Sequence, residues 1–186
     1  DIGGFFGANI YDEDYHEVFV RWFEYGTFCP VMRLHGYRMP YQPQYGTTGG
    51  AECVSGAPNE IWSYGDEVYE ICKKYIELRE AMRPYIRTLM EAAHEKGTPI
   101  MRPMFYDFPE DKVCWENESQ YMFGPDILVA PVMERGQKKK EVYLPKGSTW
   151  TNPWTGESYE GGQKVTVETT REQIPLFTRD NFKFEV

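Results

Sequence analysis

Residues 1–7 have the sequence DIGGFFG, and this stretch decides how the first half of the chain folds. We interpret Asp1 as a carboxylate at the tip of a buried strand, followed by two glycines that let the backbone turn sharply. Residues 30–36, PVMRLHG, have the same form, a short apolar strand with polar groups at its end. A helical pattern separates the two stretches. The order strand, helix, strand predicts a parallel α/β scaffold that presents a site at neighbouring strand ends.

Three segments carry the three- and four-residue spacing of an amphipathic helix. The first covers residues 11–28 and is preceded by acidic residues that favour a helix N-terminus. The second begins at about Asp66 and runs to Met82, and the third runs from Tyr85 to Lys96. Gly97 is the expected C-cap of the third helix.

Residues 36–65 are rich in Gly, Pro, Tyr and Gln and show no clear periodicity. Loops of this length are uncommon unless they line a site or pack as a lid. The aromatic residues of this loop either form the wall of a sugar pocket or tie the loop to the body of the protein. We favour the second interpretation for most of them: Tyr37, Tyr41, Tyr45 and Trp62.

After Pro99 the pattern changes to short strand-like segments separated by turn residues, at 100–105, 121–123, 127–132, 141–144 and 164–167. This pattern predicts an all-β module, a β-sandwich. We therefore place a domain boundary near Gly97, with an α/β part at residues 1–97 and a β-sandwich with its own core at residues 98–186. Two barrel strands and their helices cannot close a barrel, so we expect residues 1–97 on their own to expose apolar faces that include Val18, Trp22, Ile71 and Leu78, and to aggregate, whereas residues 98–186 fold alone.

The composition excludes several classes of protein. The formal net charge is −9 and no basic run exceeds three lysines, which argues against nucleic acid as a partner. No stretch of about 18 apolar residues is present, so we expect no membrane-spanning segment. The chain contains 14 Tyr, 11 Phe and 5 Trp residues. Such rings suit the stacking of sugars, although they also fill β-rich cores.

The cysteines and histidines do not form a recognisable metal or catalytic pattern. Four cysteines lack the CxxC spacing and have no histidine at ligand spacing, so we expect free thiols and neither a metal site nor a cofactor. Ser-His-Asp, P-loop and HExxH motifs are absent. His16 and His94 lie among charged neighbours on predicted helices, and we interpret them as solvated. We interpret Asp107, Glu110 and Asp111 as solvated charges of a turn.

The polar residues at the two strand ends form the candidate site. Asp1 and His35 supply a carboxylate and an imidazole that are suited to hydrogen-bonding the hydroxyls of a bound sugar. Arg33 is suited to orienting Asp1 through a charge-assisted pair. The alternative is that Asp1 and Arg33 form only a structural ion pair at the rim of a barrel.

The residues quoted above, with three further stretches, resemble glycoside hydrolase family 31. The stretches are DIGGF at 1–5, RWF at 21–23, MRLHG at 32–36, GTPIMRPM at 97–104 and QYMFGPDILVAPV at 120–132. Their order and spacing match the family over essentially the whole chain.

The resemblance implies the C-terminal part of a (β/α)8 barrel followed by a proximal β-sandwich. It implies a retaining α-glycosidase, an α-glucosidase or α-xylosidase, that acts on oligosaccharides or glycosides through a covalent glycosyl-enzyme. The two catalytic aspartates of the family stand on earlier barrel strands, in an upstream part of the polypeptide. We therefore expect no catalytic residue in this chain and no activity of the chain alone.

The resemblance also assigns roles to four residues. Asp1 matches a pocket aspartate, His35 a sugar-binding histidine, Arg33 the arginine beside it, and Phe5 an aromatic residue near the leaving group. The Arg-Leu-His-Gly form is closer to the α-xylosidase branch than to many α-glucosidases. The alternative function is a non-catalytic carbohydrate-binding β-sandwich module, which the aromatic C-terminal half favours and the α/β character of residues 1–97 disfavours.

Overall fold

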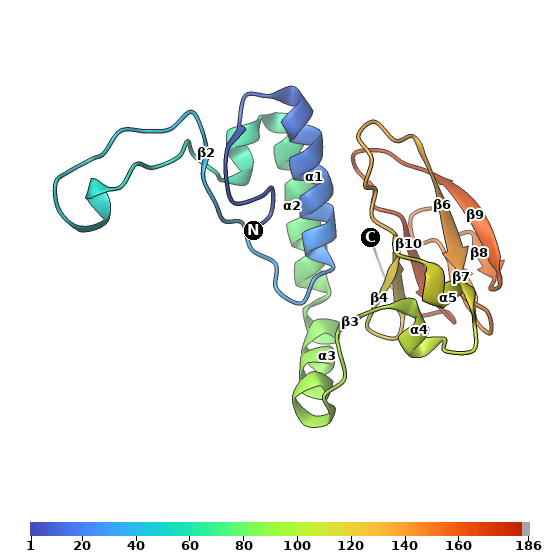
Figure 1. Cartoon of the computed structure of the whole chain (residues 1–186). Coiled ribbons are helices and arrows are strands. Elements are labelled where there is room, and N and C mark those ends of the chain that lie inside the picture. The colour runs from blue at the N-terminus through green and yellow to red at the C-terminus, as the bar shows by residue number, and fades with distance from the viewer. Residues whose placement is uncertain (184–186) are drawn as a thin grey trace.

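The computed structural model describes residues 1–183 and contains three long helices in its first half (Figure 1). These are α1 (Glu13–Thr27), α2 (Asp66–Ala81) and α3 (Arg83–Lys96). The Asp12 side chain accepts a hydrogen bond from the Asp14 amide, 3.0 Å away, and so caps α1. Gly97 has a φ of 69° and ends α3 in the left-handed conformation. The three helices predicted from apolar periodicity are therefore confirmed, with small shifts at their ends.

The two N-terminal strands run in parallel but form few strand hydrogen bonds. Ile2 and Leu34 make an isolated parallel bridge, and β1 (Ala8–Asn9) pairs in parallel with β2 (Arg38–Met39). The predicted parallel α/β order is confirmed. The strands themselves are shorter than the sequence suggested, because glycines with positive φ at positions 3, 4 and 7 turn the backbone out of the extended conformation.

The second half contains one antiparallel six-stranded sheet and a separate two-stranded ribbon. The order in the sheet is β3 (Met101–Arg102), β4 (Tyr121–Phe123), β5 (Ile127–Val129), β10 (Leu176–Arg179), β7 (Thr149–Thr151) and β8 (Ser158–Glu160). The ribbon pairs β6 (Lys139–Leu144) with β9 (Gln163–Glu168). The predicted strands are present, except that Pro103 ends β3 and begins the short helix α4 (Met104–Asp107). A second short helix, α5 (Val113–Glu116), follows.

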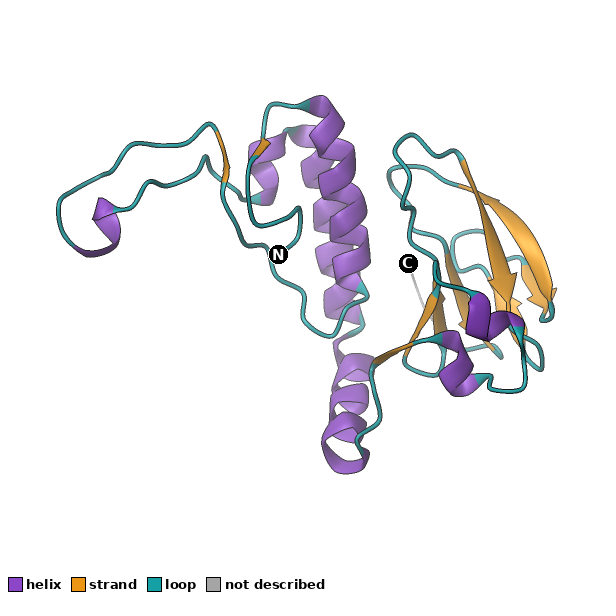
Figure 2. Ribbon diagram, viewed as in Figure 1, coloured by secondary structure: helices purple, strands orange, loops and turns teal. Residues whose placement is uncertain are grey.

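The strands β4, β5 and β10 of the six-stranded sheet are buried on both faces. Along β4 and β5, Phe123, Ile127 and Val129 belong to the hydrophobic cluster of the helices, whereas Met122 and Leu128 belong to a second cluster. The second cluster includes Val142 and Leu144 of β6, which cover the other face of the sheet. The result is three layers, helices, sheet and ribbon, which Figure 2 shows in order across the molecule. The predicted β-sandwich is present as the sheet and the ribbon.

Exposure varies along the helices and the loop of the first half. In the whole chain Val18 and Trp22 are exposed, whereas Ile71 and Leu78 are buried in the cluster that sheet residues complete. The loop 36–65 contains the short 3-10 helices η1 (Gly49–Glu52) and η2 (Ile61–Tyr64). The part around η1 projects away from the helices (Figure 1), whereas η2 packs on α2 and buries Tyr64. Most of the loop's predicted anchors are more than half exposed, so that prediction was wrong: Tyr41, Tyr45 and Trp62.

Candidate functional site

The Ile2–Leu34 bridge brings the ends of the two N-terminal segments together. The Ile2 amide donates to the Arg33 carbonyl at 3.2 Å, which sets the residues on either side of the bridge next to one another. Arg33 Nη2 donates to Asp1 Oδ1 at 2.9 Å, so the predicted pair forms. The Arg33 side chain is 59% exposed and the Asp1 side chain 38% exposed. The carboxylate is therefore oriented by the guanidinium and still open on one side.

Phe5 and His35 form the second pair of the site. Their ring centroids are 5.3 Å apart with an interplanar angle of 44°. The Tyr37 amide donates to the Phe5 carbonyl at 2.7 Å, which fixes the two segments beside each other at this point. Both rings are exposed. Within residues 1–183 no hydrogen bond joins Asp1 to His35, so the four predicted residues form two neighbouring pairs.

Gly36 allows the two segments to approach this closely. Its φ is +126°, and a Cβ at this position would lie 2.7 Å from the carbonyl oxygens of Gly4 and Phe5. Real Cβ atoms do not approach backbone oxygens so closely, so a side chain here would push the segments apart. The glycine of the Arg-Leu-His-Gly sequence is therefore a requirement of packing next to His35.

The sequence analysis missed Arg38, which connects the backbone of both segments. This side chain is fully buried. Its Nη2 donates to the Ile2 carbonyl at 2.9 Å, its Nη1 to the carbonyls of Gly4 at 2.8 Å and Tyr37 at 3.0 Å, and its Nε to Tyr64 Oη at 3.0 Å. No periodic pattern surrounds Arg38 in the sequence, and an arginine in a loop normally indicates solvent. Only the folded backbone shows that three carbonyl oxygens converge there.

Tyr15 supports the same turn from α1. Its hydroxyl donates to the Gly3 carbonyl at 2.8 Å, and Arg38 lies over its ring at 5.7 Å. Burial raises the pKa of Tyr15, and the positive charge of Arg38 only partly opposes this. The phenol is therefore a neutral donor under ordinary conditions. The backbone that carries Asp1 and Phe5 is thus held from two sides by buried side chains.

The acidic turn at residues 107–111 is not a solvated loop, which corrects the sequence interpretation. Asp111 is buried and accepts from Tyr143 Oη at 2.7 Å, the Lys146 amide at 2.9 Å and the Val113 amide at 3.3 Å. Burial favours a raised pKa, but these hydrogen bonds outweigh it and hold the pKa of Asp111 below its usual value. Asp111 therefore connects α5 to the ribbon as a structural acceptor.

Asp107 is also paired rather than solvated. Its Oδ1 lies 3.0 Å from Arg102 Nη1, and only 5% of the Arg102 side chain is exposed. Burial raises the pKa of Asp107, and Arg102 opposes this shift. Of the three residues predicted as loop charges, only Glu110 remains exposed.

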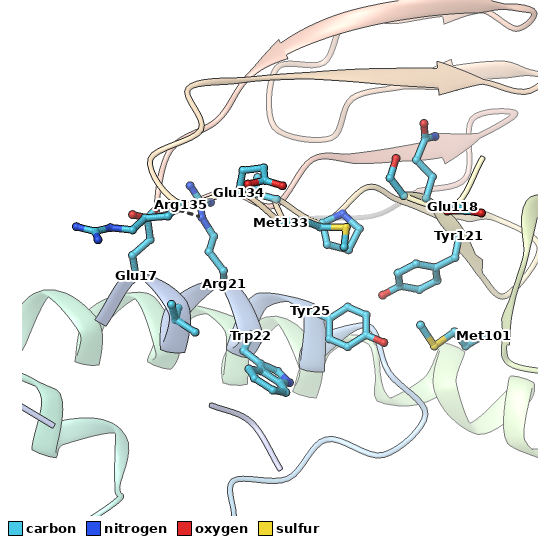
Figure 3. Close-up of a pocket in the computed structure, with 15 residues that line it drawn as sticks. Glu17, Arg21, Trp22, Tyr25, Met101, Glu118, Tyr121, Met133, Glu134 and Arg135 are labelled. Carbon is cyan, nitrogen blue, oxygen red and sulfur yellow. Dashed lines mark ion pairs between the residues drawn. The ribbon is translucent and has the colours of Figure 1, made fainter. Parts of the chain in front are cut away.

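A pocket between the helices and the β part does not coincide with the candidate site. It has a volume of about 720 Å³ and lies between α1 and the loops of the β part (Figure 3). Aromatic, aliphatic and charged side chains line it, with the Tyr25 and Tyr121 rings 6.0 Å apart. Asp1, Phe5, Arg33 and His35 do not line it. This pocket is a groove between the helices and the β part, and we do not assign it to the sugar.

Residues 1–183, which the structure describes, contain neither a metal-binding cluster nor a membrane-spanning helix. In that part of the chain, no group of three or more His, Cys, Asp or Glu side chains is placed to hold a metal ion. The same residues contain no helix that is both long and apolar enough to cross a bilayer. Cys29, Cys53, Cys72 and Cys114 are free, as the sequence predicted.

Two family descriptions match consecutive parts of the chain. The glycosyl hydrolases family 31 TIM-barrel domain matches residues 1–89, and the glycosyl hydrolase family 31 C-terminal domain matches residues 97–182. The chain belongs to glycoside hydrolase family 31. The expected fold, the end of a barrel followed by a β domain, is thereby confirmed. A barrel match over the first half also disfavours the alternative of a free-standing carbohydrate-binding module.

Several relatives and structures resemble the chain over nearly its whole length. An alpha-xylosidase of Saccharolobus solfataricus is 41% identical and an alpha-glucosidase 2 of Bacillus thermoamyloliquefaciens is 33% identical, each over 96% of this chain. The crystal structure of a family 31 alpha-xylosidase from a soil metagenome, complexed with xylose, is 49% identical over 98% of this chain, with a TM-score of 0.94. The chain spans only 22%, 20% and 27% of these three proteins, respectively.

Proposed function

We propose that the polypeptide containing this chain is a retaining α-glycosidase that releases terminal α-linked xylose or glucose from oligosaccharides or glycosides. The observation that carries the proposal is the 49% identity and the TM-score of 0.94 to an alpha-xylosidase complexed with xylose. We favour xylose because the Arg-Leu-His-Gly form at 33–36 resembles the α-xylosidase branch. Glucose is the second candidate, since alpha-glucosidases are also among the relatives.

In this proposal the chain supplies substrate-binding groups, and the nucleophile and the acid/base come from upstream barrel strands. Asp1, oriented by Arg33 at 2.9 Å, accepts hydrogen bonds from sugar hydroxyls. His35 hydrogen-bonds a further hydroxyl, and its contact with Phe5 sets the plane of its ring. Bonds of this kind are expected to strengthen as the sugar ring flattens toward an oxocarbenium-like transition state.

The proposal is tested by comparing the full-length polypeptide with the 186-residue chain. We expect the full-length protein to hydrolyse an aryl α-xyloside faster than the matching aryl α-glucoside, with retention of anomeric configuration measured by NMR. The chain alone is expected to be inactive because it lacks the two catalytic carboxylates. Turnover by the chain alone, or inversion by the full-length protein, would contradict the proposed mechanism.

Substitutions of His35 and Asp1 test the role of the two pairs in the full-length enzyme. Losing a hydrogen bond with charged character costs roughly 1.5–3 kcal/mol. At about 1.4 kcal/mol per decade, His35→Ala and Asp1→Asn are each expected to lower kcat/KM by about ten- to a hundredfold. Arg33 is largely exposed, so removing the charge of Asp1 leaves no buried cation unpaired.

The same variants separate a binding role from a structural role. An exposed ion pair contributes about 0–1 kcal/mol to stability, so Asp1→Asn should hardly change the melting temperature. A lowered melting temperature with unchanged kcat/KM would instead assign Asp1 and His35 to bracing of the barrel rim. Both quantities are to be measured on the same preparations.

A further inference from the structure

A segment of the β part, residues 169–175, contacts the helices through one buried phenol. The Ile174 amide donates to Tyr75 Oη of α2 at 2.9 Å. The same oxygen lies 3.2 Å from the Glu172 carbonyl and 3.1 Å from Glu24 Oε1 of α1. Tyr75 is fully buried and Glu24 is 1% exposed. Three parts of the fold therefore meet at a single hydroxyl group.

Counting protons shows what this arrangement requires. A phenol has one proton to donate and two lone pairs that accept. The Ile174 amide occupies one lone pair of Tyr75. If Glu24 is ionised, the one Tyr75 proton serves either the carboxylate or the Glu172 carbonyl. If Glu24 carries a proton, its own O–H donates to the second lone pair of Tyr75, and Tyr75 donates to Glu172. Only the protonated form makes all three contacts at once.

The charged groups around Glu24 supply other partners but do not restore the hydrogen bond between Tyr75 and Glu172. On α1, Arg21 Nη1 lies 3.3 Å from Glu24 Oε2, but Arg21 also contacts the Thr170 carbonyl and Glu17. On α2, Lys74 Nζ donates to the Glu172 carbonyl at 3.2 Å, so that oxygen keeps one donor in either state. Cys72 of α2 is also near Glu24.

The remaining charged groups of the segment are Arg171 and Glu172, and the charge of Glu172 acts on Lys74. Arg171 is paired with Glu67 at 3.5 Å, and the Glu172 backbone, through its carbonyl, makes the contacts with Tyr75 and Lys74. Burial raises the pKa of Glu24 to about 8, although Arg21, Tyr75 and Lys74 oppose the shift. The direction of this shift agrees with the proton count.

We propose that Glu24 holds a proton while the β part is docked on the helices, so that docking of residues 169–175 is a proton-linked latch. Loss of the proton removes one of the hydrogen bonds that join Tyr75 to Glu24 and to the Glu172 carbonyl, and it places a negative charge in a buried contact, which weakens the attachment of the segment. This proposal is independent of the glycosidase proposal because it concerns how the two parts of the chain hold together.

The sign of the pH dependence follows from the raised pKa. The protonated Glu24 stabilises the docked segment fully below pH 4.5, the ordinary pKa of a glutamate. This stabilisation is lost as the pH rises through about 8. Between these values, opening of the latch releases one proton. The opening equilibrium is therefore expected to increase by up to about tenfold per pH unit in this range.

Hydrogen exchange of the full chain tests the proposal. We expect the protection factor of residues 169–175, corrected for intrinsic exchange, to fall steeply between pH 5 and pH 8 in the wild type and to level off above about pH 8. Glu24→Gln keeps a donor toward Tyr75 and cannot ionise, so its protection should be nearly constant over this range. Glu17→Gln is the matched control, because it removes a carboxylate beside Arg21 without touching Tyr75, and it should keep the wild-type slope.

A second measurement uses the wild type alone, so it does not depend on whether a variant folds. In the wild type labelled with 13C at the glutamate carboxyl carbons, one resonance is expected to titrate near pH 8, well above the others. The proposal is overturned if every glutamate titrates at its ordinary value, or if the wild-type protection factor is flat with pH. It is also overturned if Glu24→Gln retains the wild-type pH dependence.

Discussion

Arg38→Leu is expected to lower the free energy of unfolding by at least about 2 kcal/mol. The substitution removes the donor of the Ile2, Gly4 and Tyr37 carbonyls and of Tyr64 Oη, and the contacts with Ile2 and Tyr64 are buried. Each buried acceptor left without a partner costs about 1–3 kcal/mol, so these two cost about 2–6 kcal/mol. This is a large fraction of the roughly 5–15 kcal/mol that stabilises a typical domain.

The chain offers a matched control in Arg33→Leu. Arg33 is the same residue type on the same side of the fold, but its side chain is 59% exposed and makes one ion pair. Its replacement is expected to cost less than about 1 kcal/mol. Urea unfolding of both variants measures the difference. If the two variants unfold within about 1 kcal/mol of each other, Arg38 does not hold the two segments together as the structure indicates.

Arg38→Lys provides a finer test of geometry. Lysine keeps the positive charge but lacks the planar fork that reaches three carbonyls from two nitrogens. We therefore expect Arg38→Lys to recover only part of the lost stability. Full recovery would mean that charge, rather than the hydrogen bonds to Ile2 and Gly4, is what the site needs.

The helices and the site segments were predictable because their signals are local. Periodic apolar residues gave the helices, and the glycines beside Asp1 and His35 indicated turns that the positive φ angles confirm. The roles of Arg38 and Asp111 were not predictable, because their partners come from backbone groups up to 36 residues away in the sequence. A buried polar residue and a solvated one look alike until the chain is folded.

The division of the core was also not predictable from the sequence. Strands of three residues, such as β4 and β5, contain too few positions to show which face each side chain occupies. The sequence suggested that residues 98–186 have a core of their own, and the second hydrophobic cluster does lie entirely within them. The sequence did not show that the other face of their sheet shares a cluster with α1 and α2.

Separating the chain at residues 97 and 98 is therefore expected to unfold or aggregate both pieces. Five side chains of the β part, all fully buried, belong to the hydrophobic cluster of the helices: Phe123, Ile127, Val129, Ile174 and Leu176. Burying one such side chain stabilises a protein by about 1.5–3 kcal/mol, so five contribute about 7–15 kcal/mol. That sum is comparable to the whole stability of a typical domain, about 5–15 kcal/mol.

The polar contacts across the same boundary add to this loss. Tyr121 Oη donates to the Phe28 carbonyl at 3.0 Å, and Tyr85 Oη donates to the Phe123 carbonyl at 3.1 Å. In the separated pieces these groups face water, together with the apolar face of the sheet. Residues 1–97 lose the same contacts from the other side, which adds Ile71 and Leu78 to the already exposed Val18 and Trp22.

Thermal unfolding is to be measured for residues 1–97, residues 98–186 and the whole chain. Binding of a hydrophobic dye is to be measured for the same three proteins. We expect dye binding and no cooperative transition for either piece, and a cooperative transition for the whole chain. Mixing the two pieces during refolding should restore the transition in part, because the contacts between them need no covalent link. A monomeric piece of residues 98–186 that melts cooperatively without binding dye would contradict this expectation. It would show that the hydrophobic cluster between the sheet and the ribbon is sufficient for folding without the helices.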